Sequence, residues 1–123
     1  MSRFKQQGFS NTFKNARKGM RLVLKSEVNI RVHLVIGFLV MVCAFLLKFS
    51  TEKICILLLT IALVMVAEMI NSAVEFALDA VFHNKYSKLV GMAKDISAGA
   101  VMLASIVAII IGILLFLPEL ILR

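Results

Sequence analysis

The sequence predicts an all-α integral membrane protein, in which three transmembrane helices follow an amphipathic helix at the membrane interface. Two observations lead to this fold class. Hydrophobic residues make up 61% of the 123 residues, and the mean hydropathy is +0.97. Soluble domains average about 45–50% apolar residues, and small ones bury only about two thirds of their surface. Three long apolar runs also separate the basic segments, so we expect one membrane-embedded domain, residues 1–123.

Residues 1–30 are expected to form the interfacial helix. Apolar side chains recur there at steps of three or four, at Phe9, Phe13, Ala16, Met20 and Leu24. Lysines and arginines fill the positions between them. This spacing is typical of a helix that lies along a membrane surface, with its apolar side down and its basic side toward anionic headgroups.

The three spans are expected at residues 32–49, 54–79 and 95–118. A hydrocarbon core of about 30 Å needs roughly 20 helical residues. The first run is interrupted only by His33 and closed by Lys48, and the third is uncharged until it stops at Pro118. The second must continue past its own acidic residues to be long enough. No cleavable signal peptide is expected, because the first apolar run begins too late in the chain.

The basic residues predict the orientation. Eleven of the fourteen lie in residues 1–31 or in the loop after the second span. By the positive-inside rule, the N-terminus and that loop face the cytoplasm. The net charge of +7 therefore indicates a membrane surface and no nucleic-acid partner. Cys43 and Cys55 lie in apolar runs without metal-ligand spacing and are expected to act as small apolar residues.

The second run ends in AEMINSAVEFALD, residues 67–79, which carries a polar stripe. On a helix one face presents Glu68, Asn71, Glu75 and Asp79, with Ser72 at its edge. A carboxylate within a membrane costs about 2.5–3.5 kcal/mol, so such groups face a protein interior or a wet cavity. With Asp79 near the cytoplasmic surface, Glu68 is expected about 16 Å deeper. The alternative is a structural polar network, although joining helices usually needs one amide rather than three carboxylates.

Charges on the cytoplasmic side indicate a phosphate-bearing ligand. Crowded carboxylates in a low dielectric favour a bound cation, and Glu27 and Glu75 could share a divalent ion. Oxygen ligands suit Mg²⁺, which bridges phosphates. Lys94 begins the third span, where a helix N-terminus also attracts anions. Neither a Walker A sequence nor GxGxxG is present, and the Lys94–Asp95 pair alone is more often a helix cap.

Three segments resemble the prokaryotic diacylglycerol kinase family, the small integral-membrane lipid kinases that include undecaprenol kinase. EMINSAVEFALD (residues 68–79) resembles the family signature, AKDISAGAV (residues 93–101) its second block and KGMRLVLKSEVNIRVHL (residues 18–34) its N-terminal block. The resemblance covers almost the whole chain. It implies a kinase in the bacterial plasma membrane that uses ATP and Mg²⁺ to phosphorylate a lipid alcohol, and it implies a homotrimer with shared active sites.

The resemblance also implies residue roles. Glu68 matches the general base that takes the proton from the lipid hydroxyl, and Asn71 matches its neighbour in the active site. Glu27 and Glu75 match the ligands of the Mg²⁺ that accompanies ATP.

The nucleotide contacts come from the third span and the loop before it. Lys94 and Asp95 match the family pair that contacts the nucleotide, with the lysine on phosphate oxygens. Tyr86 matches the loop of the family, and we count Lys85 with it among the candidate nucleotide contacts. Lys85 and Ser87 stand where some members have Glu and His.

The lipid acceptor and the assembly complete the expectations. EVNIRVH (residues 27–33) resembles the undecaprenol kinase branch, so undecaprenol is favoured and diacylglycerol is the alternative. A seam of small residues in the third span, at Ala100, Ala104, Ala108 and Gly112, predicts close helix packing and an oligomer. The rival functions are a proton-coupled transporter, which would usually need four or more spans, and a non-catalytic membrane subunit, which should lack deep carboxylates.

Overall fold

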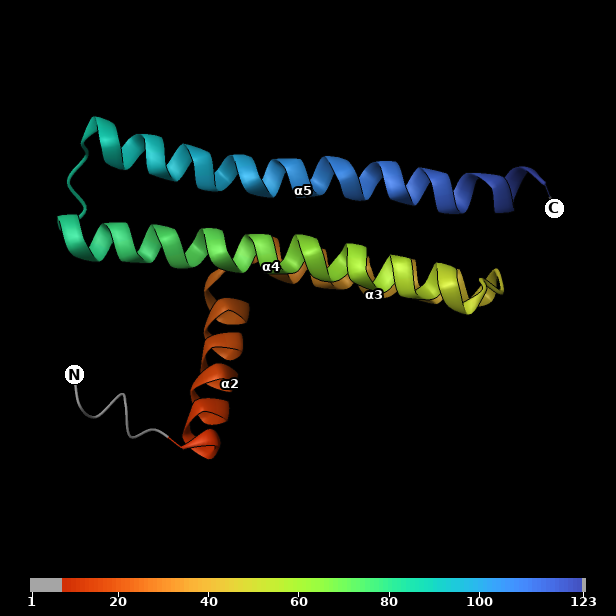
Figure 1. Ribbon diagram of the computed structural model, residues 1–123, viewed down its shortest axis with the longest axis horizontal. Helices are drawn as coiled ribbons and strands as arrows, with labels where there is room; N and C mark the ends of the chain where they lie inside the picture. The colour runs from red at the N-terminus through yellow and green to blue at the C-terminus, as the bar shows by residue number, and fades with distance from the viewer. Residues whose placement is uncertain (1–7, 123) are drawn as a thin grey trace.

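The computed structural model describes residues 8–122, and all regular structure in that range is helical. The helices are α2 (Phe9–Ser26), α3 (Val28–Leu46), α4 (Thr51–Phe82) and α5 (Lys88–Ile121). Figure 1 shows α4 and α5 side by side and antiparallel, with α3 along α4. Helix α2 runs across the direction of the other three and meets them where α3 begins. The fold is therefore a three-helix bundle with one crossing helix.

The corner between α2 and α3 is held by one arginine. Glu27 is both the last cap of α2 and the first cap of α3, and its backbone is extended, with φ −115° and ψ 109°. Arg31 Nη1 donates hydrogen bonds of 2.8 Å to the carbonyl oxygens of Leu24 and Lys25. These carbonyls end α2 and have no partner within the helix, so the guanidinium satisfies them. Residue 27 is thereby held at the corner.

Three long apolar helices are present, as the sequence predicts, and each is long and apolar enough to cross a bilayer. At 1.5 Å per residue, the 19 residues of α3 measure about 28 Å, whereas the 32 of α4 and 34 of α5 measure about 48 and 51 Å. Helices α4 and α5 therefore exceed a hydrocarbon core of about 30 Å. Figure 1 shows both continuing past the α2 corner to the loop that joins them.

Both long helices extend beyond the predicted boundaries, because polar caps lie outside the uncharged runs. Ser50 accepts a hydrogen bond from the Lys53 N–H at 3.3 Å, and Ser87 accepts one from the Val90 N–H at 3.2 Å. Such serines satisfy the free N–H groups of a first turn. At the other end, α5 passes through Pro118 to Ile121 instead of stopping there. The proline costs one backbone hydrogen bond and lies in the last turns, where φ near −65° is already helical.

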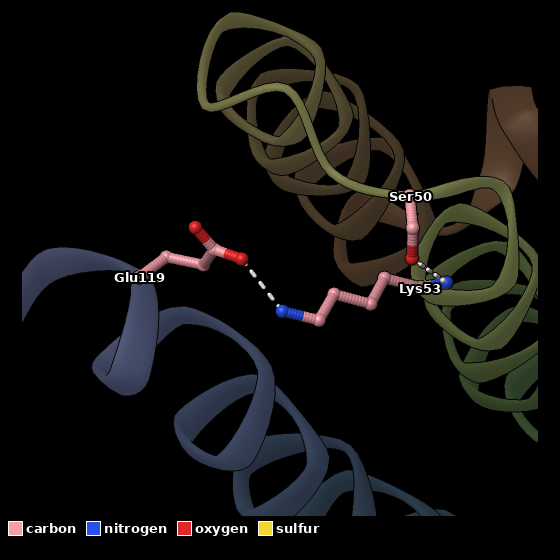
Figure 2. Close-up of polar contacts among 3 residues, drawn as sticks. All are labelled: Ser50, Lys53 and Glu119. Atoms are coloured by element: carbon pink, nitrogen blue, oxygen red, sulfur yellow. Dashed lines mark hydrogen bonds and ion pairs between the residues drawn. The ribbon is translucent and has the colours of Figure 1, made fainter. Parts of the chain in front are cut away.

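The end of the bundle remote from α2 is closed by an ion pair over aromatic rings. Figure 2 shows Lys53 Nζ reaching from α4 to Glu119 Oε1 on α5, at 2.6 Å. The same ammonium lies 5.3 Å from the centroid of the Phe49 ring. The Phe49 and Phe116 ring centroids are 4.8 Å apart. These contacts join the start of α4 to the end of α5.

Small residues set how closely the helices approach. A Cβ added at Gly37 on α3 would lie 2.9 Å from Ile61 Cγ2 on α4, so glycine permits this crossing. The predicted small-residue seam divides between two faces of α5. Ala108 and Gly112 line a pocket that α5 shares with α3 and α4, whereas Ala100 and Ala104 line a groove along α4 and α5. Steps of four residues on a helix of 3.6 per turn rotate the seam around the axis.

Candidate active site

The polar stripe of α4 faces the interior of the bundle, as the sequence predicts. Glu68 is 7% exposed and Ser72 is 5% exposed, and Asn71, Glu75 and Asp79 are half-buried. One end of the stripe faces α3 and the other faces α5. Burying carboxylates costs free energy, so proteins normally keep them inside a membrane segment only where they serve a function. This polar face is therefore a candidate site.

Glu68 lies against a histidine of the neighbouring helix. His33 Nδ1 on α3 is 2.8 Å from Glu68 Oε1, although the N–H direction is not aligned for a linear hydrogen bond. Three atoms here are buried and lack an aligned partner within residues 8–122: His33 Nδ1, Glu68 Oε2 and Asn71 Oδ1. More than about 90% of buried polar groups in proteins are hydrogen-bonded. Unpartnered atoms at one place therefore indicate a binding position for a polar group.

Glu68 and Asn71 open into a polar pocket of about 200 Å³. It is lined from the α2–α3 corner by Glu27, Asn29 and Ile30, from α4 by Glu68, Asn71 and Ser72, and from α5 by Ala98 and Val101. The structure thus brings three predicted site residues, Glu27, Glu68 and Asn71, to one pocket. Glu27 reaches it because the Arg31 corner places residue 27 beside α4.

A second, apolar pocket of about 360 Å³ lies on the other side of His33. Apart from His33 its polar side chains are Thr60 and Ser105, and the rest of its wall is apolar residues of α3, α4 and α5. The Glu68–His33 pair therefore lies where the polar and apolar pockets meet. The sequence marks His33 as an interruption of the first apolar run and as part of the segment EVNIRVH, without a role in the site. The sequence signal for its role was a polar residue inside an apolar run whose helix packs against α4.

Glu68 lies close to the corner between α2 and α3. His33, its partner, lies in the second turn of α3, close to the corner where α2 crosses. Glu68 is thus near the level of α2, and the remainder of α4 to Phe82 extends about 21 Å beyond it. From the level of this corner the stripe runs along α4 toward the loop that joins α4 and α5.

The far end of the stripe carries a second ion pair. Lys94 Nζ on α5 donates to Asp79 Oδ1 on α4 at 2.7 Å, and Lys94 also interacts electrostatically with Glu75. Sequence reasoning placed Asp79 on the stripe without a role. Its partnership with Lys94 depends on how α4 and α5 align.

The predicted nucleotide contacts Lys85, Tyr86 and Asp95 lie at this end of the stripe and do not line the polar pocket. Asp95 and Lys85 are exposed, and Tyr86 is 83% exposed. The Tyr86 ring nevertheless covers Gly91, because a Cβ added there would lie 2.8 Å from Tyr86 Cε2. His83 has a positive φ of 52°, which ends α4 and turns the chain back toward α5.

Within the described part of the chain, no three His, Cys, Asp or Glu side chains are grouped closely enough to hold a metal ion by themselves. Mg²⁺ is usually bound by one or two carboxylates, with substrate phosphates and waters completing the octahedron. Glu27 lines the polar pocket, whereas Glu75 does not line it and interacts electrostatically with Lys94.

The chain is similar to known proteins over most of its length. The family model for prokaryotic diacylglycerol kinase matches residues 14–116. A diacylglycerol kinase of Synechocystis sp. is 38% identical over 109 residues, which are 89% of this chain and 62% of the relative. The undecaprenol kinase of Bacillus subtilis is 33% identical over 91% of this chain and 90% of its own length. A diacylglycerol kinase of Escherichia coli (strain K12) is 35% identical over 84% of this chain and 86% of its own length.

The match to the family model and to relatives along nearly their full length agrees with the three apolar helices and the buried acidic stripe. The relatives are named as kinases of two different lipid alcohols. The chain belongs to the prokaryotic diacylglycerol kinase family, and it is a phosphotransferase with an alcohol group as acceptor.

Proposed function

We propose that this protein transfers the γ-phosphate of ATP, in the presence of Mg²⁺, to the hydroxyl of a membrane lipid alcohol, with undecaprenol as the favoured acceptor. The observation that carries the proposal is the position of Glu68. Its buried Oε2 has no partner among the described residues, and it lies where a polar pocket meets an apolar one. A lipid alcohol would fit such a junction, with its hydroxyl at the polar pocket and its apolar tail in the apolar one.

In the proposed reaction, Glu68 is the general base. Its carboxylate accepts the proton of the lipid hydroxyl as the hydroxyl oxygen forms a bond to the γ-phosphorus. The bond from that phosphorus to the β–γ bridging oxygen breaks, and its electron pair leaves with ADP. Asn71 lies one helical turn from Glu68 and lines the same pocket, where its amide would orient the hydroxyl or a phosphate oxygen.

The nucleotide end would use the charges beyond Glu68. Glu27 and Glu75 would hold Mg²⁺, which when bound neutralises charge on the phosphates. Lys94 would contact phosphate oxygens, with Asp79 fixing the direction of its ammonium. Asp95, Lys85 and Tyr86 are exposed on this side, where a nucleotide would arrive from the cytoplasm.

The membrane arrangement follows from the same proposal. Helix α2 would lie in the cytoplasmic interface of the bacterial plasma membrane, with Glu68 just below the headgroups and the N-terminus in the cytoplasm. An apolar groove of about 760 Å³ along α4 and α5, which includes Ala100 and Ala104, would receive a neighbouring chain of a homotrimer. Crosslinking in native membranes tests this assembly, and a uniformly monomeric protein would contradict it.

The choice of acceptor rests on the segment EVNIRVH and on the relative named undecaprenol kinase. Relatives named diacylglycerol kinase support the alternative that the product is phosphatidic acid. The deciding experiment incubates purified protein in detergent with labelled ATP, Mg²⁺ and either lipid. Faster labelling of undecaprenol supports the first acceptor, and faster labelling of diacylglycerol supports the second. Label in neither lipid would overturn the kinase proposal and favour a transporter.

A further inference from the structure

We infer that His33 is a positioning residue for the base Glu68: it holds Oε1 of the carboxylate so that Oε2 is presented to the lipid hydroxyl. The inference rests on the proposed function and adds a residue to it. Its basis is the 2.8 Å approach of His33 Nδ1 to Glu68 Oε1, between side chains of two different helices.

His33 is the residue whose chemistry fits this task. Among the residues that line the polar and apolar pockets, it is the one basic side chain. The other ionisable group there is Glu27, at the α2–α3 corner, whose charge would repel the carboxylate of Glu68. From α5 the polar pocket receives only Ala98 and Val101, which offer no side-chain hydrogen bond. Apart from Asn71 and Ser72 on α4 itself, a donor that orients Glu68 therefore has to come from α3.

The two oxygens of the Glu68 carboxylate have different surroundings, which supports the same conclusion. Oε1 faces His33, whereas Oε2 is buried and has no partner in residues 8–122. A glutamate has three rotatable side-chain bonds, and the oxygen of a general base must lie within about 2.6–3.2 Å of the oxygen that carries the proton. Fixing Oε1 limits the rotamers of the Glu68 side chain, and therefore the positions that Oε2 can take. Without substrate, catalytic hydrogen bonds are often poorly aligned, and they tighten in the reacting complex. The inference requires the same of the hydrogen bond from His33 to Glu68.

His33 also marks where the lipid hydroxyl would lie. The same imidazole lines the apolar pocket and contacts the acid of the polar pocket. A tail in the apolar pocket would thus bring its hydroxyl beside the Glu68–His33 pair. A displacement of about 1 Å at a reacting group can cost 100-fold in rate, so loss of this contact should be visible in kcat.

The test compares His33→Leu, which keeps bulk and removes the polar contact, with His33→Gln, which keeps a donor. Val32→Ala is the control, because Val32 is an exposed neighbour on α3 that lines neither pocket. We expect His33→Leu to lower kcat by about 10- to 100-fold while KM for ATP changes less than about twofold. His33→Gln should recover at least a several-fold part of that loss, and Val32→Ala should behave as the unaltered protein.

Two results would overturn the inference. One is a His33→Leu protein with unaltered kcat. The other is a His33→Gln protein as slow as His33→Leu, although both melt at the same temperature as the unaltered protein in detergent. Glu68→Gln, assayed in parallel, separates this inference from the proposed function. If Glu68→Gln is inactive and His33→Leu is normal, only the role of His33 fails, whereas an active Glu68→Gln protein removes the base itself.

Discussion

Lys94 on α5 and Asp79 on α4 form an ion pair in which Nζ and Oδ1 are 2.7 Å apart. The pair bridges the two long helices beyond the level of Glu68, and Glu75 lies within electrostatic reach of the same ammonium. The acidic stripe therefore contacts a base at each end: His33 at Glu68 and Lys94 at Asp79.

Asp79→Ala should raise KM for ATP several-fold, because Lys94 loses the partner that directs its ammonium toward phosphate. Activity measured over a range of ATP concentrations at saturating Mg²⁺ checks this. Glu119→Gln is the matched control, since it breaks the similar ion pair with Lys53 at the opposite end of the bundle. An equal rise in KM in both variants would point to general loosening of the α4–α5 pair.

Glu68→Gln should lower turnover by at least about 100-fold and leave ATP binding nearly unchanged. The amide keeps the shape of the side chain but cannot accept the hydroxyl proton as a carboxylate does. Nucleotide affinity from calorimetry and phosphate transfer from a labelled-lipid assay separate the two effects. Near-normal turnover would exclude Glu68 as the base.

If Glu75 is a metal ligand as proposed, Glu75→Gln should increase the Mg²⁺ concentration needed for half-maximal activity, because that carboxylate becomes a neutral amide. A magnesium titration at fixed ATP measures the shift. Glu27→Gln should behave alike, and the double variant should show less than the sum of the two free-energy effects if both ligands share one ion. Independent, additive effects would argue against a common site.

Gly91→Ala should displace the Tyr86 ring without unfolding the protein. The new Cβ would lie 2.8 Å from Tyr86 Cε2 and from its hydroxyl oxygen, and an exposed ring is free to move away. If Tyr86 contacts the nucleotide, KM for ATP rises while the melting temperature stays nearly constant. The same substitution made in a Tyr86→Ala background should then have no further effect on KM.

Gly37→Ala should destabilise the bundle, because its Cβ would lie 2.9 Å from Ile61 Cγ2 in the contact between α3 and α4. Overpacking of this kind costs about 1–3 kcal/mol. Thermal unfolding in detergent measures the loss, and Gly112→Ala, which meets no atom within 4 Å, is the control. A double variant with Ile61→Leu, which lacks the β-branched methyl Cγ2, should recover stability if that methyl is the obstacle.

The sequence by itself determined the number of spans and the face of α4 that carries the acids. Both follow from local rules: a bilayer demands about 20 apolar residues per helix, and a period of 3.6 places Glu68, Asn71, Glu75 and Asp79 on one side. It also identified the family through EMINSAVEFALD. The family model confirms that resemblance.

Only the tertiary structure decided which groups these acids meet. His33 pairs with Glu68, and Lys94 with Asp79, because of how α3 and α5 are rotated and shifted along α4, which no local pattern specifies. The same is true of Glu27, which reaches the pocket through the corner held by Arg31. Local spacing determines which side chains share a helix face, but contacts between helices depend on packing across the whole bundle, where one glycine or one arginine sets the register of many residues.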